Sequence, residues 1–276
     1  MPNSSTLLRD VVLVALSAGD AVTEIYRQAA GPDVSYKEDA SPLTAADLAS
    51  HRVIVSSVRG LSPEVPVLSE EGADRPYEAR RIWPRFWLVD PLDGTKEFIR
   101  RNGEFTVNIA LIEDGVPVLG VVHAPVLGRT YSGVRGEGAW RRDGDAAPVR
   151  IDACGTDGGE LAVVASRSHP GPLLAGFLDR LPEHRLVSMG SSLKLCLVAE
   201  GTADVYPRLG PTMEWDTAAA HAVVSAAGGE VLDFEGRPLE YNKENLLNPH
   251  FIVLGRRSVP WREAFAAASS VSPDLG

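Results

Sequence analysis

Acidic residues gather at three points of the chain where their type and spacing suit metal chemistry. They are the pair Glu70-Glu71, the pair Asp90 and Asp93, and the single Asp216. The first two groups end apolar strands and the third opens a helical pattern. A carboxylate at the end of a buried strand is costly unless another group offsets its charge. Magnesium does this well, because it takes oxygen ligands and usually binds through a few carboxylates plus a substrate phosphate.

The most specific of these patterns is the string Asp90-Pro91-Leu92-Asp93-Gly94-Thr95. Pro91 and Gly94 favour a tight turn, so both carboxylates and the Leu92 carbonyl are expected to converge on one point. Thr95 then begins a helix, where free backbone N–H groups favour a phosphate.

Each acidic group also has an ordinary structural interpretation. A lone aspartate at a helix start, such as Asp216, is usually an N-cap. Glu70-Glu71 taken alone fits a solvated surface pair. Only the co-occurrence of all three groups favours a metal site over these alternatives.

The composition fits a folded enzyme that acts on a small molecule. The chain has 276 residues, of which 44% are hydrophobic and 23% charged, and its formal net charge is -10. A nucleic-acid groove is disfavoured, because phosphate backbones need a basic surface. A small phosphorylated substrate is compatible with this charge, since bound cations reverse the local field.

Cysteine content and hydropathy bear on the compartment. Two cysteines, Cys154 and Cys196, are too few for a disulfide framework, which favours a protein of the reducing cytoplasm. Both cysteines are therefore interpreted as small apolar residues. The apolar run 11–18 is too short to span a bilayer. Peripheral association with the inner face of the cell membrane stays open, although no basic amphipathic helix supports it.

The acidic groups need a scaffold that brings them together. In the first half, the patterns predict three helices and five strands. The helices cover 5–29, 44–59 and 96–101, and the strands cover 65–68, 86–89, 106–112, 117–124 and 129–134. The last three strands are predicted to form an antiparallel meander. The glycine-rich run 133–138 is predicted to be a hairpin, because it does not stand between a strand and a helix as a dinucleotide fingerprint would.

A polar stretch over 141–160 is the best candidate boundary. Beyond it, strands and helices alternate. The strands are predicted over 161–165, 185–189, 203–207, 230–233 and 251–254, and the helices over 172–181, 192–199 and 217–227. The expected fold class is therefore α/β, with an α+β first half (1–150) that binds metal and an α/β second half (151–276) that completes the site.

Four elements of the sequence resemble the lithium-sensitive, magnesium-dependent phosphatase superfamily that includes inositol monophosphatase. They are Asp47, Glu70-Glu71, Asp90 to Thr95 and Trp215 to Ala219. Within it, the chain is most similar to the CysQ type of 3′(2′),5′-bisphosphate nucleotidase. The strings that carry this similarity are 87–99, 101–111, 166–169, 190–194 and 206–208. The resemblance implies a layered αβαβα sandwich and removal of the 3′-phosphate from adenosine 3′,5′-bisphosphate, with the 3′-phosphosulfate as a further substrate.

The resemblance also implies roles for the acidic residues, with two or three Mg²⁺ ions as cofactor. Glu70, Asp90 and the Leu92 carbonyl would hold one ion. Asp90, Asp93 and Asp216 would hold a second, with Asp90 bridging. Glu70 and Thr95 would orient the attacking water, and Asp47 would support Thr95 or Lys37.

Contacts to the substrate are implied in the same way. Those expected are Asp93, Gly94, Thr95, His169, Ser191, Lys194, Arg208 and Asp216. For His169 a surface histidine, for Ser191 a helix cap, and for Arg208 an ordinary surface pairing are the alternatives. The expected partner is a small phosphorylated nucleotide, with no nucleic acid and no integral membrane segment. The chain would be a monomer or a homodimer.

Three other functions stay open at this stage. The same chemistry on inositol monophosphate or fructose bisphosphate is the first. A non-catalytic phospholigand-binding protein on this fold is the second, but it would be expected to lack a metal carboxylate or Thr95. A metal-free structural domain is the third, and it leaves the acids at strand ends unexplained.

Overall fold

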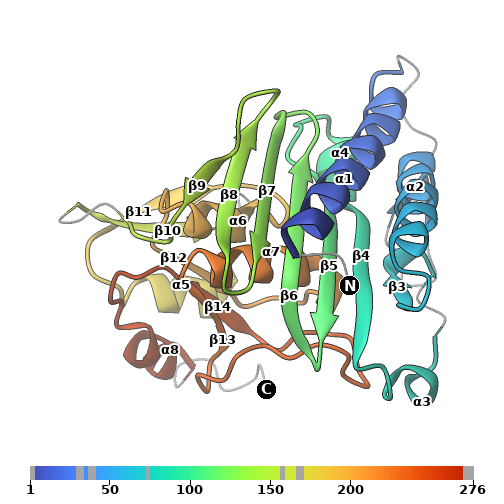
Figure 1. Ribbon diagram of the computed structural model, residues 1–276. Coiled ribbons are helices and arrows are strands. Elements are labelled where there is room, and N and C mark those ends of the chain that lie inside the picture. The colour runs from blue at the N-terminus through green and yellow to red at the C-terminus, as the bar shows by residue number, and fades with distance from the viewer. Residues whose placement is uncertain are drawn as a thin grey trace.

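The computed structural model describes residues 4–28, 34–36, 42–72, 75–155, 159–165 and 171–269. Two sheets and the helices around them are stacked in five layers (Figure 1). This is the layered αβαβα arrangement that the family resemblance implies.

A seven-stranded sheet forms the first half. Its order, β3-β4-β5-β6-β7-β8-β9, follows the chain, and every pair is antiparallel except β3 with β4. The strands are β3 (Val67–Ser69), β4 (Arg85–Asp93), β5 (Thr106–Glu113), β6 (Val116–Ala124), β7 (Arg129–Val134), β8 (Gly138–Asp143) and β9 (Val149–Ile151). The predicted meander is confirmed. The second half of β8 and all of β9 lie in the stretch 141–160 that was predicted to be a boundary, so the first sheet ends only at Ile151.

Two helices cover the outer face of this sheet. They are α1 (Ser4–Tyr26) and α2 (Ala45–Leu61), and short elements accompany them. These are β1 (Val34–Tyr36), β2 (Pro42–Thr44), the 3₁₀ turn η1 (Glu70–Gly72), α3 (Tyr77–Arg80) and α4 (Thr95–Ile99). Apolar residues of α1 at helical spacing, including Val11, Ala15 and Val22, are fully buried against the sheet.

The second half holds a five-stranded sheet of order β11-β10-β12-β14-β13. Its strands are β10 (Leu161–Ala165), β11 (His184–Ser188), β12 (Val205–Arg208), β13 (Glu230–Asp233) and β14 (Phe251–Leu254). The first three pair in parallel and the last two antiparallel, so the sheet is mixed. Helices α5 (Pro172–Leu178) and α8 (Trp261–Ser269) pack on its outer face.

Helices α6 (Leu193–Ala199) and α7 (Glu214–Ala226) lie between the two sheets and share one core with both. Two glycines let α7 approach the first sheet closely. A Cβ on Gly120 would lie 2.1 Å from the Ala219 carbonyl oxygen, and one on Gly133 would lie 2.8 Å from the Val223 Cα. These contacts hold the middle and later part of α7 against β6 and β7.

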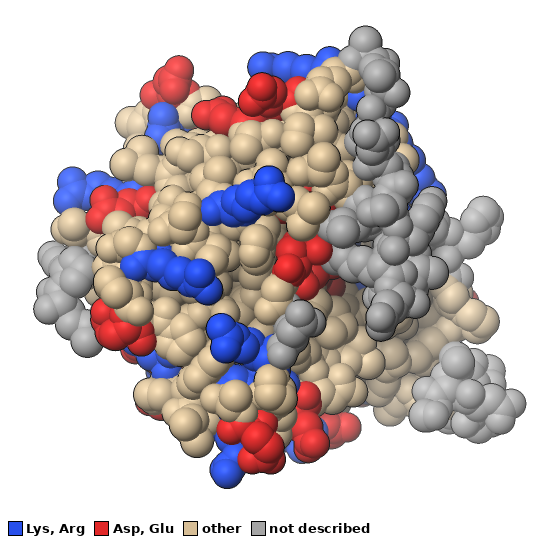
Figure 2. All heavy atoms as spheres, turned by 90° about the vertical axis from the view of Figure 1, so that its right-hand side faces the viewer, with Lys and Arg blue, Asp and Glu red and all other residues tan. Residues whose placement is uncertain are grey.

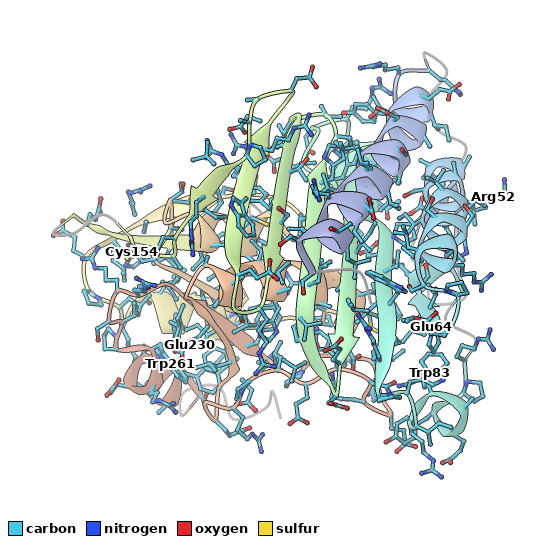
Figure 3. All side chains as sticks on the ribbon, viewed as in Figure 1. Arg52, Glu64, Trp83, Cys154, Glu230 and Trp261 are labelled. Carbon is cyan, nitrogen blue, oxygen red and sulfur yellow. The ribbon has the colours of Figure 1, made fainter. Side chains whose placement is uncertain are left out.

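The remaining expectations concern cysteines, surface charge and membrane spans. Neither cysteine forms a disulfide: Cys154 is exposed, away from α2 in Figure 3, and Cys196 is buried. On the face shown in Figure 2, described basic and acidic side chains are interspersed, with no broad basic surface. Within the described ranges, none of the helices combines the length and apolarity needed to cross a bilayer.

Candidate active site

Asp90 and Asp93 stand where β4 leaves the first sheet. Asp90 pairs with Asn108 and Asp93 with Thr106, and the register shifts between these two pairs. The Leu92 N–H donates to Asp90 Oδ1 at 3.0 Å, which closes the turn. Gly94 follows with φ of 90°, in the left-handed region that favours glycine. The turn expected from Pro91 and Gly94 is therefore an irregularity within β4, which includes Asp90 to Asp93, and the strand ends in a turn at Gly94.

Asp216 is placed by the first turn of α7. The backbone N–H of Met213 donates to Asp216 Oδ2 at 2.9 Å, so one carboxylate oxygen caps the helix. Trp215 is buried in the core shared by the two sheets. Asp216 is therefore the third residue of the helix rather than its N-cap, and it accepts a hydrogen bond from the N-cap residue while it stands in the acidic cluster.

The three aspartates converge. One carboxylate oxygen from each of Asp90, Asp93 and Asp216 lies within 4.8 Å of the others. Asp90 is only 1% exposed. Burial, together with the charges of Glu70 and Asp93, raises the pKa of Asp90 well above its usual range. Burial and Asp93 raise the pKa of Asp216 to about 8.

Three oxygen donors of like charge at this spacing fit a hard divalent cation. A carboxylate cluster in a partly buried site is unfavourable until protons or cations compensate it. The Leu92 carbonyl, in the same turn, adds a neutral oxygen. Magnesium prefers such oxygen donors and often completes its shell with water and substrate phosphate. The donor set therefore fits the metal that the sequence predicts.

Glu70 lies in η1, directly after β3. Its charge contributes to the raised pKa values of both Asp90 and Asp216, so it faces the same site. It does not belong to the group of oxygens within 4.8 Å. Glu70 therefore lies near the acidic cluster, but farther from the three aspartates than they lie from one another.

Asp47 and Thr95 do not make the contact that the sequence interpretation expected. Asp47 Oδ2 accepts hydrogen bonds from the Thr44 N–H at 2.8 Å and the Thr44 hydroxyl at 2.6 Å, which caps α2. Burial raises the pKa of Asp47 despite these bonds. The Thr95 hydroxyl donates to the Leu92 carbonyl at 3.4 Å instead. Lys37, the other predicted partner, lies outside the described residues.

A cavity of about 600 Å³ opens beside the cluster, bounded by α4, α6, β12 and the start of α7. The predicted substrate residues that line it are Asp93, Gly94, Ser191, Lys194, Arg208 and Asp216. Thr95 is not among the lining residues, and His169 lies outside the described part of the chain. Most of the predicted substrate contacts therefore share one cavity.

The cations of this cavity differ in their existing contacts. Arg208 donates to the carbonyls of Gly210 and Pro211, at 3.3 and 2.8 Å. Lys194 Nζ lies 5.8 Å from the centre of the Tyr206 ring. Sequence reasoning missed two further cations that line the cavity, Lys96 of α4 and Arg100, the residue that caps its C-terminal end. Their spacing of four residues, which places both on one face of a helix, was the signal that would have found them.

Ser191 occupies an unusual position. Its backbone has φ of 56°, which is uncommon for a residue other than glycine. The Ser191 hydroxyl donates to Asp93 Oδ2 at 2.6 Å, and the Ser192 N–H donates to the same oxygen at 2.5 Å. Ser191 therefore contacts an acid of the metal cluster as well as lining the cavity.

The comparisons agree with this geometry. The family model described as the inositol monophosphatase family matches residues 5–270. This chain belongs to the inositol monophosphatase family. Among curated relatives, the 3′(2′),5′-bisphosphate nucleotidase CysQ of Escherichia coli K12 is 53% identical over 249 residues, covering 90% of this chain and 99% of the relative. The corresponding Haemophilus influenzae protein is 37% identical over 261 residues, covering 94% and 96%.

Solved structures of the inositol monophosphatase family have the same fold. CysQ from Bacteroides thetaiotaomicron superposes with a TM-score of 0.79 at 44% identity, covering 92% of this chain and 98% of that one. The Thermotoga maritima inositol monophosphatase superposes with a TM-score of 0.77 at 24% identity, covering 98% and 100%, which supports the fold alone. Family membership makes a magnesium-dependent phosphatase the expected activity class.

Proposed function

We propose that this protein is a magnesium-dependent phosphatase that removes the 3′-phosphate of adenosine 3′,5′-bisphosphate, giving adenosine monophosphate and phosphate. The observation that carries the proposal is the convergence of Asp90, Asp93 and Asp216 within 4.8 Å at one end of a large cavity. Similarity to nucleotidases over nearly their whole length supports the choice of substrate.

Asp90, Asp93 and Asp216 would hold one ion, and Asp90, Glu70 and the Leu92 carbonyl a second, with Asp90 shared. Bound Mg²⁺ neutralises phosphate oxygens, makes water a better nucleophile and stabilises the leaving oxygen. A third ion near Glu70 belongs to the same proposal. The carboxylates supply the negative charge that would hold these cations, because the basic side chains of the protein offset little of that charge.

The remaining groups of the site position the reactants. Phosphoryl transfer depends mainly on alignment and charge stabilisation. The backbone N–H groups of Gly94 and Thr95 would donate to the transferred phosphate. Glu70 and the Thr95 hydroxyl would orient the water for in-line attack, and Asp47 would act only indirectly, by capping α2 through Thr44. A water beside Asp216 would protonate the departing 3′-oxygen.

The rest of the cavity suits a substrate with a second anionic group. Four cations line it, and the side chains of Lys96 and Arg100 form no ion pair or hydrogen bond with the side chains or backbone of the other described residues. A phosphate monoester carries a charge of roughly -1.5 to -2 at neutral pH. Lys194 and Arg208 would contact the 5′-phosphate or ribose, together with Ser191 and His169, and Lys96 and Arg100 would add to the local positive field.

The division of labour between the two halves is part of the same proposal. Residues 1–150 would supply most of the metal site. Residues 151–276 would supply the pocket walls through α6 and β12, and would complete the metal site with Asp216.

A substrate panel tests the proposal. Purified protein would be given adenosine 3′,5′-bisphosphate, its 3′-phosphosulfate, inositol 1-phosphate and fructose 1,6-bisphosphate, with Mg²⁺ or with EDTA. We expect the adenosine bisphosphate to give the highest kcat/KM, and EDTA to abolish phosphate release. Faster turnover of the inositol or hexose phosphate would refute the substrate assignment. Absence of turnover with all four would instead support a binding protein.

The cavity cations offer a sharper version of this test. The double variant Lys96→Met with Arg100→Met should lower kcat/KM for the bisphosphate more than for adenosine 3′-monophosphate. The reason is that only the bisphosphate has the second anionic group. Lys194→Met serves as a comparison on the opposite wall. Equal losses for both substrates would show that α4 does not distinguish them.

A further inference from the structure

A buried set of polar side chains joins Asp93 to the interior of the first sheet. Thr106 and Asn108 project from β5, and Ser191 and Ser192 precede α6. None of the four is more than 8% exposed. Their hydrogen bonds lie largely out of reach of bulk water, so each donor and acceptor has to be accounted for within the protein.

The contacts form one continuous path. The Ser191 hydroxyl donates to Asp93 Oδ2 at 2.6 Å. Thr106 Oγ1 lies 2.6 Å from Ser191 Oγ and 2.8 Å from Ser192 Oγ. Ser192 Oγ lies 2.9 Å from Asn108 Oδ1. All four distances are those of hydrogen bonds between oxygen atoms.

Counting protons shows that these four contacts cannot all be hydrogen bonds with Asn108 as an acceptor. Three hydroxyls carry three protons. The Ser191 proton goes to Asp93, because an ionised carboxylate only accepts. The Thr106 proton must then go to Ser191, which leaves the Ser192 proton for the Thr106 contact. No hydroxyl proton remains between Ser192 and Asn108.

The amide of Asn108 resolves this shortage. The nitrogen and oxygen of a side-chain amide are assigned from the surrounding hydrogen bonds. Asn108 Nδ2 is buried and has no partner, which is unfavourable for a donor. Exchanging the two atoms directs an N–H toward Ser192 Oγ at the observed separation. That single change supplies the missing proton and replaces the unpaired N–H donor by an unpaired carbonyl oxygen, which is tolerated better in a protein interior.

We propose that a one-way chain of hydrogen-bond donors runs from Asn108 through Ser192, Thr106 and Ser191 to Asp93 Oδ2, and that it positions Asp93 for metal binding. This hydrogen-bond chain occupies Oδ2 of Asp93, so Oδ1 would be the oxygen available to hold a cation. It rests on the proposed magnesium site and adds Thr106 and Asn108 to it as positioning residues. Neither residue touches the metal or the substrate in this role.

This chain of hydrogen bonds also joins the two halves of the protein. Thr106 and Asp93 belong to the first sheet, whereas the serines begin the helix that carries Lys194 into the cavity. The Ser192 N–H adds a second bond to Asp93 Oδ2 from that same turn. Movement of α6 away from β5 would therefore break the support of Asp93, so the pocket wall and the metal site are mechanically linked.

Thr106→Val tests the chain at its middle. Valine has nearly the shape of threonine but carries no hydroxyl. Mg²⁺ binding would be measured by calorimetry on the full chain without substrate, beside thermal unfolding. We expect the Mg²⁺ dissociation constant to rise about tenfold, as is typical when an outer-shell partner of a ligand is removed. Thr106→Ser should restore the wild-type value, because it restores the hydroxyl.

Thr130→Val is the matched control. Thr130 is a buried threonine in β7 of the same sheet, and its hydroxyl pairs with His123 at 2.9 Å, away from the acidic cluster. This variant should lose stability while keeping Mg²⁺ affinity within about twofold of the wild type. An equal loss of affinity in both valine variants would overturn the proposal, because it would show a general loosening of the sheet.

Ser191→Ala examines the last link and covers the case in which Thr106→Val does not fold. It should weaken Mg²⁺ binding at least as much, and adding Thr106→Val to it should change affinity no further. Unchanged affinity in Ser191→Ala, or independent losses that multiply, would contradict the chain. Wild-type protein that binds no Mg²⁺ would instead refute the proposed metal site itself.

Discussion

Two carboxylates in the first turn of α7 have opposite surroundings. Glu214 is 0% exposed, and it accepts from Lys243 Nζ at 2.6 Å and from the backbone N–H groups of Asn242 and Lys243 at 2.6 and 3.0 Å. Asp216, two residues later, accepts from Met213 N–H and otherwise faces acids, which help raise its pKa to about 8.

The difference separates a structural charge from one kept for a ligand. Glu214 has its compensating cation within the chain, so it needs nothing from solution and fastens α7 to the loop 240–248. Asp216 has no such partner among the described residues beyond the attraction of Arg208. A partly buried acid that the fold leaves uncompensated, such as Asp216, is a candidate metal ligand, whereas a compensated one such as Glu214 has a structural role.

The largest expected effect is on the uncompensated side. Asp90→Asn removes the shared charge of the cluster, so we expect kcat to fall by a factor of about 10³ or more, comparable with the loss of a key electrostatic group. The protein without metal should be more stable than the wild type, because the substitution relieves repulsion among the acids. Phosphate release and thermal unfolding in EDTA measure the two effects.

A loss of activity together with a gain of stability distinguishes a metal ligand from a structural carboxylate such as Glu214. Near wild-type turnover in Asp90→Asn would exclude the proposed metal site in which Asp90 is shared. A large loss of stability in EDTA would show that Asp90 compensates some other charge, as Glu214 does, and the comparison would fail.

Glu214→Ala should have the reverse profile. It leaves two backbone N–H groups and part of Lys243 without their acceptor, so we expect a loss of about 3 kcal/mol in the free energy of unfolding. The folded fraction should keep its dependence on Mg²⁺ concentration. Urea unfolding and a Mg²⁺ titration of activity at low temperature test this. A weakened Mg²⁺ response with unchanged stability would place Glu214 in the active site.

The raised pKa of Asp216 predicts a pH dependence of the protein without metal. Its usual pKa is 3.8 and its folded value about 8, so between these values the folded state holds a proton that the unfolded state has lost. Stability should therefore fall as pH rises toward 8, by up to about 1.4 kcal/mol per pH unit. Saturating Mg²⁺ should reduce or reverse this slope.

The informative window is pH 6.5 to 8. Below it, His123 and His221 act in the opposite direction, because burial lowers the pKa of each to about 4 and their protonation favours unfolding. Urea midpoints in EDTA across the window, with Asp216→Asn as control, isolate the aspartate. A wild-type slope no steeper than that of Asp216→Asn would contradict the assignment.

The acidic site was largely predictable from sequence because its parts are local. The turn at Asp90 to Thr95 depends on Pro91 and Gly94, and the helix around Asp216 on a short apolar pattern. The strands over 106–112, 117–124 and 129–134 also agree with β5, β6 and β7 to within a residue or two. Each of these features is specified by neighbours along the chain.

Features that depend on distant partners were missed. β8 and β9 lie in a polar stretch, since they stand toward the edge of the sheet and expose Arg141, Val149 and Arg150 at least in part. The hydroxyl of Ser191 meets Asp93, which is 98 residues away. Glu214 and Lys243 are 29 residues apart, and nothing in their local sequences announces the pair. Short helices α3 and α8 were likewise not predicted.

Lys243→Met is expected to have the smallest effect, and it tests whether Glu214 and Asp216 act independently. Glu214 would keep both backbone N–H donors, and Lys243 is 31% exposed, so water already shares its charge. We expect a loss of about 1.5 to 2 kcal/mol, the value of a hydrogen bond to a charged group, with kcat and Mg²⁺ affinity within about twofold. Because the same substitution leaves the Asp216 side of α7 untouched, a tenfold change in Mg²⁺ affinity would mean that the charges at both ends of this turn act on the metal together.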